Sequence, residues 1–323
     1  MEKHNELKAA LGFFGVLKET FELIFSNKKI FSQITLALIV PLSLILQANI
    51  LVTQLLSSKI FGNNDNMHPT FDIFQYSNLN LSELNSFKGV AFWALIKFSY
   101  FFFTLIFSFL CTSTVAFIVS CIYTGNDINV KKAFSIIPKV WKQVLFTLLI
   151  SLFIVFSYDV VFGSLLVLTL GFLLNGPAII AGVVALILFF AGSLYITITW
   201  HLAIVVSVLE ENVYGIKAIT KSRFLLKGKI GLAMGMLVIS GVCSAVIDAI
   251  FQKFALRELL IQNVGIRVGI GVFCFLLESL LILFYLVVQA VVYYVCKSYH
   301  AGSFAGDASH QQKVNYIEEQ NLV

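Results

Sequence analysis

Six long apolar stretches restrict what this chain can fold into. They cover residues of about 30–57, 89–123, 143–174, 178–209, 229–252 and 267–297. A helix needs about 20 apolar residues to cross the hydrocarbon core of a bilayer. Backbone groups in that core must pair within the chain, and no stretch alternates polar and apolar residues as a barrel strand does. The stretches therefore predict an all-α, polytopic membrane protein with six transmembrane helices.

The composition excludes a water-soluble globule. Hydrophobic residues make up 59% of the chain and charged residues 12%, whereas soluble proteins have about 25% charged residues. So much apolar surface cannot be hidden inside a soluble domain of this length. The 5 cysteines have the spacing of neither a disulfide framework nor a zinc site. We expect no metal ion and no cofactor.

The placement of positive charge predicts the orientation. Most of the 22 Lys and Arg residues lie before the first span, at 131–142, at 217–229 or in the C-terminal tail. Cytoplasmic loops are rich in Lys and Arg, so both termini are predicted to be cytoplasmic. The triplet Asn80-Leu81-Ser82 then lies in a lumenal or extracellular loop, where Asn80 is a candidate glycosylation site. We expect an integral membrane protein of the secretory pathway, in the endoplasmic reticulum or plasma membrane.

A basic segment with apolar residues every three or four positions precedes each odd-numbered span. These segments cover about 6–27, 127–142 and 212–228. They predict three amphipathic helices that lie in the membrane interface. Each would open one unit of a parallel threefold repeat, over about 6–123, 127–209 and 212–297. Residues 1–302 then form a single membrane domain, and the polar segment 303–323 is predicted to be a disordered cytoplasmic tail.

The third basic segment carries a recognisable motif. From Val208 to Gly228 the chain reads V-x-E and then G-x-x-A-x-x-x-S-x-x-L-x-K-G. This pattern resembles that of bacterial membrane domains, such as the one joined to some glycerophosphodiester phosphodiesterases. The whole chain also resembles a plant family of six-span membrane proteins of uncertain function. Because the soluble phosphodiesterase domain has no counterpart here, the resemblance implies a non-catalytic membrane domain.

The residues of this motif also have physical interpretations. Glu210 is expected to lie at the N-terminal end of the next helix, where a carboxylate suits the helix dipole. Ser222 is expected to bond back to its own helical turn. Lys217, Lys221 and Arg223 are candidate contacts for anionic lipid headgroups, at about 1 kcal/mol each.

Ionisable residues within the spans form a second candidate site. They are Lys97, Asp159, Asp248 and Glu278. An unpaired carboxylate in hydrocarbon is costly, so each must pair, become protonated or face water. Either these residues line an outward-facing polar cavity, or Lys97 pairs with one acid and holds helices together. His201, in the fourth span, is expected to form a hydrogen bond to a neighbouring helix.

The sequence contains no catalytic motif such as H-E-x-x-H, G-x-S-x-G or a phosphate-binding P-loop. It therefore favours a non-enzymatic membrane scaffold or lipid-organising protein. Its expected partners are anionic lipids, and a membrane protein or second copy of the chain is a further candidate; nucleic acid is not expected. One alternative is a transporter or channel for a small or lipidic solute that uses the buried carboxylates. The other is an intramembrane enzyme with His201 and a carboxylate as acid and base.

Overall fold

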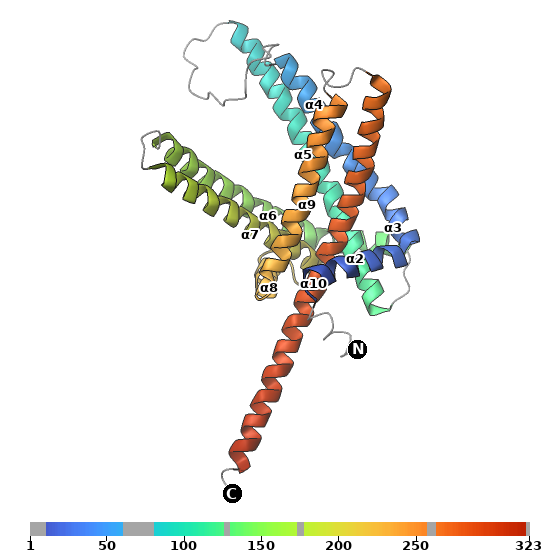
Figure 1. Ribbon diagram of the computed structural model, residues 1–323, viewed down its shortest axis with the longest axis vertical. Helices are drawn as coiled ribbons and strands as arrows, with labels where there is room; N and C mark the ends of the chain where they lie inside the picture. The colour runs from blue at the N-terminus through green and yellow to red at the C-terminus, as the bar shows by residue number, and fades with distance from the viewer. Residues whose placement is uncertain (1–10, 61–80, 126–129, 173–177, 257–262, 321–323) are drawn as a thin grey trace. The chain divides into compact units, whose positions relative to one another are not determined.

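The computed structural model describes residues 11–60, 81–125, 130–172, 178–256 and 263–320, and every regular element in this part of the chain is helical (Figure 1). The α-helices are α2 (Phe13–Ser26), α3 (Lys28–Ile34), α4 (Val40–Ile60), α5 (Leu81–Thr124), α6 (Val130–Phe172), α7 (Ala178–Leu209), α8 (Ile216–Leu226), α9 (Ile230–Ile250) and α10 (Val264–Gln320). Two π-helical segments are η1 (Thr35–Ile39) and η2 (Phe251–Leu256). The predicted all-α class is confirmed.

Six helices among the described residues are long and apolar enough to cross a membrane. They are Lys28–Thr53, Trp93–Thr124, Trp141–Leu165, Gly182–Leu209, Ile230–Ala255 and Val264–Ala301. Their number and order confirm the six predicted spans. The helix that contains the third span, α6, continues to Phe172. The architecture is that of an integral, multi-pass membrane protein.

The helices form two compact units. The first consists of Met1–Ile34, Thr112–Cys243 and Leu283–Val323, and the second of Thr35–Cys111 and Ser244–Ile282. Helices α5, α9 and α10 supply residues to both units. A single membrane domain over 1–302 stays a prediction.

Aromatic and polar contacts attach α2 to the rest of the first unit. The Tyr123 hydroxyl of α5 donates a 3.2 Å hydrogen bond to Glu19 Oε1. The Phe21 ring packs on Phe284 of α10 with centroids 4.9 Å apart. Tyr123 also contacts Tyr294 of α10 in an edge-to-face arrangement at 4.8 Å. Both ring geometries are favourable ones for aromatic pairs, so α2 is anchored to two other helices.

Helices α6 and α7 form an antiparallel hairpin in the first unit (Figure 1). The Tyr158 ring stacks on Phe189, and its hydroxyl donates a 3.1 Å hydrogen bond to the Phe189 carbonyl. The same hydroxyl lies over Gly192, where a Cβ atom would be only 2.0 Å away. The missing side chain therefore permits Tyr158 to reach the α7 backbone.

The second unit is built around a small apolar cluster. Phe251, Ala255 and Cys274 are buried and pack against partly buried isoleucines of α4, α9 and α10. A hydrogen bond of 2.7 Å joins the hydroxyls of Ser43 and Ser279. Hydroxyl pairs of this kind link helices in an apolar environment.

The threefold repeat stays a prediction. Its second repeat, expected over about 127–209, does not begin with a separate helix. The segment 127–142 forms no separate helix, because from Val130 onward it is the beginning of α6. By contrast, α8 is flanked by Gly215 and Gly228, both with positive φ, which separate it from its neighbours. The chain from Val130 to Trp141 contains no glycine. Likewise α10 extends to Gln320, into the segment 303–323 for which the sequence predicts disorder.

Candidate functional site

The turn between α7 and α8 requires a glycine at position 215. Gly215 has φ 62° and ψ −131°, a combination that side chains disfavour. A Cβ atom there would lie 2.8 Å from the Phe146 ring. The Gly215 N–H donates a 2.8 Å hydrogen bond to Thr147 Oγ1. The turn therefore attaches the start of α8 to α6.

One face of α8 is buried in the first unit. Its buried residues are Ala218, Ile219, Ser222, Leu225 and Leu226. The Ser222 hydroxyl lies 2.8 Å from the Ile219 carbonyl oxygen, which confirms the predicted bond to its own turn. It also lies 3.1 Å from the Thr199 carbonyl oxygen. Ser222 thus ties α8 to α7 as well.

The other face of α8 is cationic and exposed. Lys217, Arg223 and Lys227 are exposed, and no carboxylate in the described ranges forms an ion pair with them. Two apolar side chains lie among these cations, with Ile216 68% and Phe224 43% exposed. We refer to these five residues as the α8 surface.

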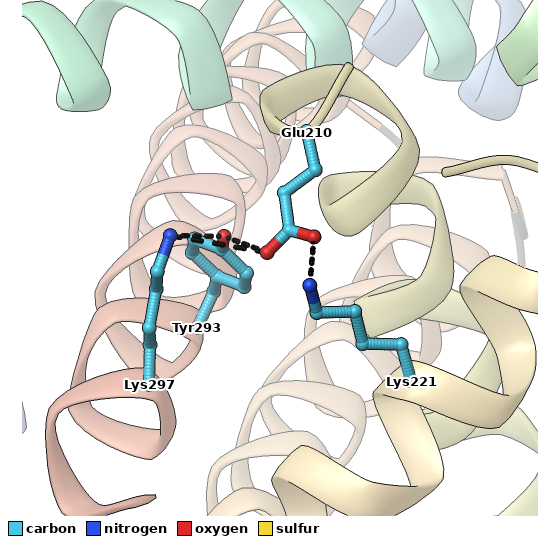
Figure 2. Close-up of polar contacts among 4 residues, drawn as sticks. All are labelled: Glu210, Lys221, Tyr293 and Lys297. Atoms are coloured by element: carbon cyan, nitrogen blue, oxygen red, sulfur yellow. Dashed lines mark hydrogen bonds and ion pairs between the residues drawn. The ribbon is translucent and has the colours of Figure 1, made fainter. Parts of the chain in front are cut away.

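Glu210 is the centre of a polar cluster that joins the end of α7 to α8 and α10 (Figure 2). Its Oε2 forms an ion pair with Lys221 Nζ, and its Oε1 accepts a 2.8 Å hydrogen bond from the Tyr293 hydroxyl. Lys297 Nζ lies 3.8 Å from Glu210 Oε1 and donates a 3.2 Å hydrogen bond to the Tyr293 hydroxyl. The Glu210 side chain is only 12% exposed, so this Glu210 cluster connects three helices in a shielded environment.

The cluster corrects the interpretation of Glu210 as a helix-dipole partner. Helix α8 begins at Ile216, with no acidic residue in its first turn. Glu210 is stabilised by two ammonium groups and a phenol instead. Lys221, a candidate headgroup contact, is engaged with Glu210, whereas Lys217 and Arg223 remain exposed.

Tyr293 and Lys297 are residues of this cluster that sequence reasoning missed. Tyr293 is 83 positions from Glu210 in the chain. The one signal for them is local, since Tyr293 and Lys297 are four residues apart and share a face of α10. Nothing in such a pair identifies a carboxylate on another helix as its partner.

Lys97 does not take the expected acidic partner among the described residues. In the second unit, its Nζ donates hydrogen bonds to Asn49 Oδ1, at 2.8 Å, and to Thr53 Oγ1. It also lies 5.7 Å from the centroid of the Trp93 ring. Neutral oxygens and a ring face thus surround this ammonium group, an arrangement known from cation–π sites.

Two of the predicted intramembrane acids, Asp248 and Glu278, belong to the second unit. Glu278 is 5% exposed, and its Oε1 accepts a 2.9 Å hydrogen bond from the Ser244 hydroxyl. Its Oε2 has no hydrogen-bond partner. Asp248 is partly buried. Asp159 belongs to the first unit, where it is exposed on α6.

His201 lies in an aromatic environment of the first unit. Its ring stacks on Trp200 with centroids 5.2 Å apart and meets Tyr285 edge-on at 5.6 Å. His201 and Tyr285 border a largely apolar cavity with Gln289. The Nε2 and Oε1 atoms of the Gln289 amide are buried and make no hydrogen bond. A hydrogen bond from His201 to a neighbouring helix stays a prediction.

No group of three His, Cys, Asp or Glu side chains within the described ranges is arranged to hold a metal ion. Asn80, the candidate glycosylation site, lies outside the described residues. The proposed roles of all these site residues remain predictions.

Comparisons with known proteins identify a family but no activity. No curated protein and no solved structure matches the chain significantly. The resemblances to the plant family and to the bacterial phosphodiesterase membrane domain gain no support from these comparisons and stay predictions. A family defined by a domain of unknown function, DUF8558, matches residues 1–320, so the chain belongs to that family.

Proposed function

We propose that this protein is a non-enzymatic, multi-pass membrane protein that binds anionic lipid headgroups through its α8 surface and thereby organises lipid. The observation that carries the proposal is the exposure of Lys217, Arg223 and Lys227 on a helix fixed to α6 and α7. A cation near an anionic membrane surface contributes about 1 kcal/mol. Three cations on one short surface can therefore bind anionic headgroups without a deep pocket.

Exposed aromatic residues support the same role for α2. Val16, Thr20 and Leu23 are the buried residues of α2, whereas Phe14 is 81% and Phe25 70% exposed. An apolar face directed away from the protein is suited to the headgroup–acyl boundary. We therefore propose that α2 and α8 are both amphipathic helices that act at the cytoplasmic leaflet, with both termini cytoplasmic. The proposed location is a membrane of the secretory pathway.

The test measures lipid retention by the intact protein. The protein is purified from mixed micelles of phosphatidylserine and phosphatidylcholine, and bound lipid is counted by native mass spectrometry. We expect the triple variant Lys217→Gln/Arg223→Gln/Lys227→Gln to lose most of the bound phosphatidylserine. The control is Lys253→Gln, which removes an exposed charge from η2, outside α2 and α8, and should leave the retention unchanged. Unchanged phosphatidylserine retention in the α8 triple variant would refute the proposal.

A second candidate function, transport of a small or lipidic solute, is favoured by Glu278. A carboxylate that is 5% exposed and has an oxygen without a hydrogen-bond partner is typical of ion and proton pathways in membranes. If this candidate is correct, Glu278→Gln abolishes solute flux in liposomes, while Glu211→Gln, a change at an exposed carboxylate, leaves it intact. Flux no higher than in empty vesicles, across a panel of solutes, would exclude it.

A further inference from the structure

We propose that a pocket between α6, α7 and α8 binds a phosphate group, through donors that include Arg223. The proposal rests on the proposed function and deepens it, because it adds one specific headgroup site to a generally cationic surface. The pocket belongs entirely to the first unit. Its lining includes Ser151 and Ile154 of α6, Thr199 and Trp200 of α7, and Ile219 and Arg223 of α8. The pocket is open on one side.

Two donors in the lining have no partner. The Ser151 hydroxyl and the Trp200 indole nitrogen are both buried and make no hydrogen bond, and Ser151 is only 2% exposed. A buried polar group without a partner is destabilising, and native proteins rarely leave one without a role. A serine in a helix has an easy alternative in the carbonyl one turn back. Ser151 does not use it, so its hydroxyl remains available to a ligand.

The chemistry of the lining selects the ligand. An indole N–H and a guanidinium are donors only, and Arg223 has no carboxylate partner among the described residues. The named lining residues include no acid. The Thr199 hydroxyl already donates to the Tyr195 carbonyl, at 2.8 Å. The ligand must therefore supply several acceptor oxygens and a negative charge, which a phosphate does better than a planar carboxylate.

The attachment of α8 explains why these donors meet. Ser222, the neighbour of Arg223, is bonded to the Thr199 carbonyl, and Thr199 is the neighbour of Trp200. At the other end of α8, Gly215 is bonded to Thr147, one turn of α6 before Ser151. These two bonds fix the position of α8 relative to both donors. Arg223 belongs to the α8 surface, and the other cations of that surface raise the local concentration of anions.

The experiment measures phosphate binding by the full chain in mild detergent. Two probes are titrated separately, dioleoyl phosphatidic acid and inorganic phosphate, and bound ligand is counted by native mass spectrometry. We expect one saturable site, with affinity about tenfold weaker in Trp200→Phe and in Arg223→Gln, because each loses a donor to a charged oxygen. Trp200→Phe keeps the ring and removes the N–H. Ser151→Ala is a second, smaller change with the same expected direction, and melting temperatures verify that all variants are folded.

The matched control is Lys217→Gln, which removes the same charge from the same helix outside the pocket. A loss of no more than about fivefold in Lys217→Gln, which corresponds to the contribution of one surface cation, supports the pocket. Equal losses in Arg223→Gln and Lys217→Gln, with none in Trp200→Phe, overturn the pocket but leave the general headgroup function standing.

Saturable binding of phosphatidic acid that inorganic phosphate does not displace assigns the site to a lipid. Binding of inorganic phosphate with the same sensitivity to Trp200→Phe assigns it to free phosphate, and binding of neither probe overturns the proposal.

Discussion

Glu210 in the first unit and Glu278 in the second are two shielded carboxylates with opposite surroundings. Glu210 has an ion pair with Lys221, a second lysine at 3.8 Å and a hydrogen bond from Tyr293. Glu278 has one hydrogen bond, from Ser244, and an oxygen without a partner. Burial alone therefore does not distinguish them, whereas their partners do.

The comparison distinguishes Glu210, a carboxylate with a structural role, from Glu278, a carboxylate with an oxygen available to bind a ligand or proton. A carboxylate whose oxygens are both engaged contributes to stability, and removing it leaves its cationic partners uncompensated. A carboxylate with a free oxygen loses solvation without full compensation, which is a feature of functional sites in membranes. The two residues should consequently respond differently to the same substitutions.

The largest effect is expected for Glu210→Ala. It leaves Lys221 and Lys297 side by side and removes the acceptor of the Tyr293 hydroxyl. We expect a loss of about 2 kcal/mol in the free energy of unfolding, measured by thermal unfolding in detergent. Glu211→Ala, at the exposed neighbouring carboxylate, is the control and should stay within about 0.5 kcal/mol. Equal losses in the two variants would mean that the Glu210 cluster has no structural role.

An intermediate effect is expected for Tyr293→Phe. Tyr293 is 1% exposed, so the ring packing is preserved while the 2.8 Å hydrogen bond to Glu210 is lost. We expect a loss of about 1 kcal/mol. The coupling with Glu210→Gln in a double-mutant cycle should account for most of that loss. Tyr299→Phe, at a partly exposed ring on the same helix, should change the stability little.

A smaller effect is expected for Lys297→Gln. The Lys297 side chain is 54% exposed, and its Nζ lies 3.8 Å from Glu210 Oε1, so water and salt weaken the attraction. We expect a loss of about 0.5 kcal/mol. Raising the salt concentration to about 1 M should abolish most of the difference, because screening then acts over about 3 Å. A loss that does not change with salt would indicate a packing role for the lysine stem.

The smallest effect is expected for Glu278→Gln, which completes the comparison. The amide can still accept the Ser244 hydrogen bond, and a neutral group loses less solvation in this buried position. We expect the free energy of unfolding to change by less than about 0.5 kcal/mol in Glu278→Gln and to fall clearly in Glu210→Gln. The two variants are measured side by side by thermal unfolding. A loss in Glu278→Gln as large as that in Glu210→Gln would remove the distinction drawn above.

Properties that arise within one segment were predictable from the sequence. The six spans follow from runs of apolar residues, because their length is set by the bilayer. The bond of Ser222 to its own turn follows from helix geometry, which brings its hydroxyl near the Ile219 carbonyl. Neither property requires knowledge of which helices are neighbours.

Properties that depend on helix neighbours were not predictable. The partners of Glu210 on α10 are set by packing over 83 positions. Asn49 and Thr53 were equally hidden as the partners of Lys97, since an acid is the default partner of an ammonium group. The segment expected to form a separate helix at 127–142 is, from Val130 onward, continuous with α6, and apolar spacing within one segment does not reveal whether a helix continues into the next.

The Glu210 cluster also has a consequence for the time course of biosynthesis. Tyr293 is made 83 residues after Glu210, which at about 5–20 residues per second corresponds to a delay of roughly 4–17 seconds. Helix α8 is synthesised early in that interval, and from then until α10 is made Lys221 is the only cluster partner of Glu210 that exists. The last helix of the chain therefore completes a charge cluster that α7 and α8 leave open. A chain released before α10 emerges lacks both Tyr293 and Lys297, and its half-finished cluster distinguishes it from the complete protein.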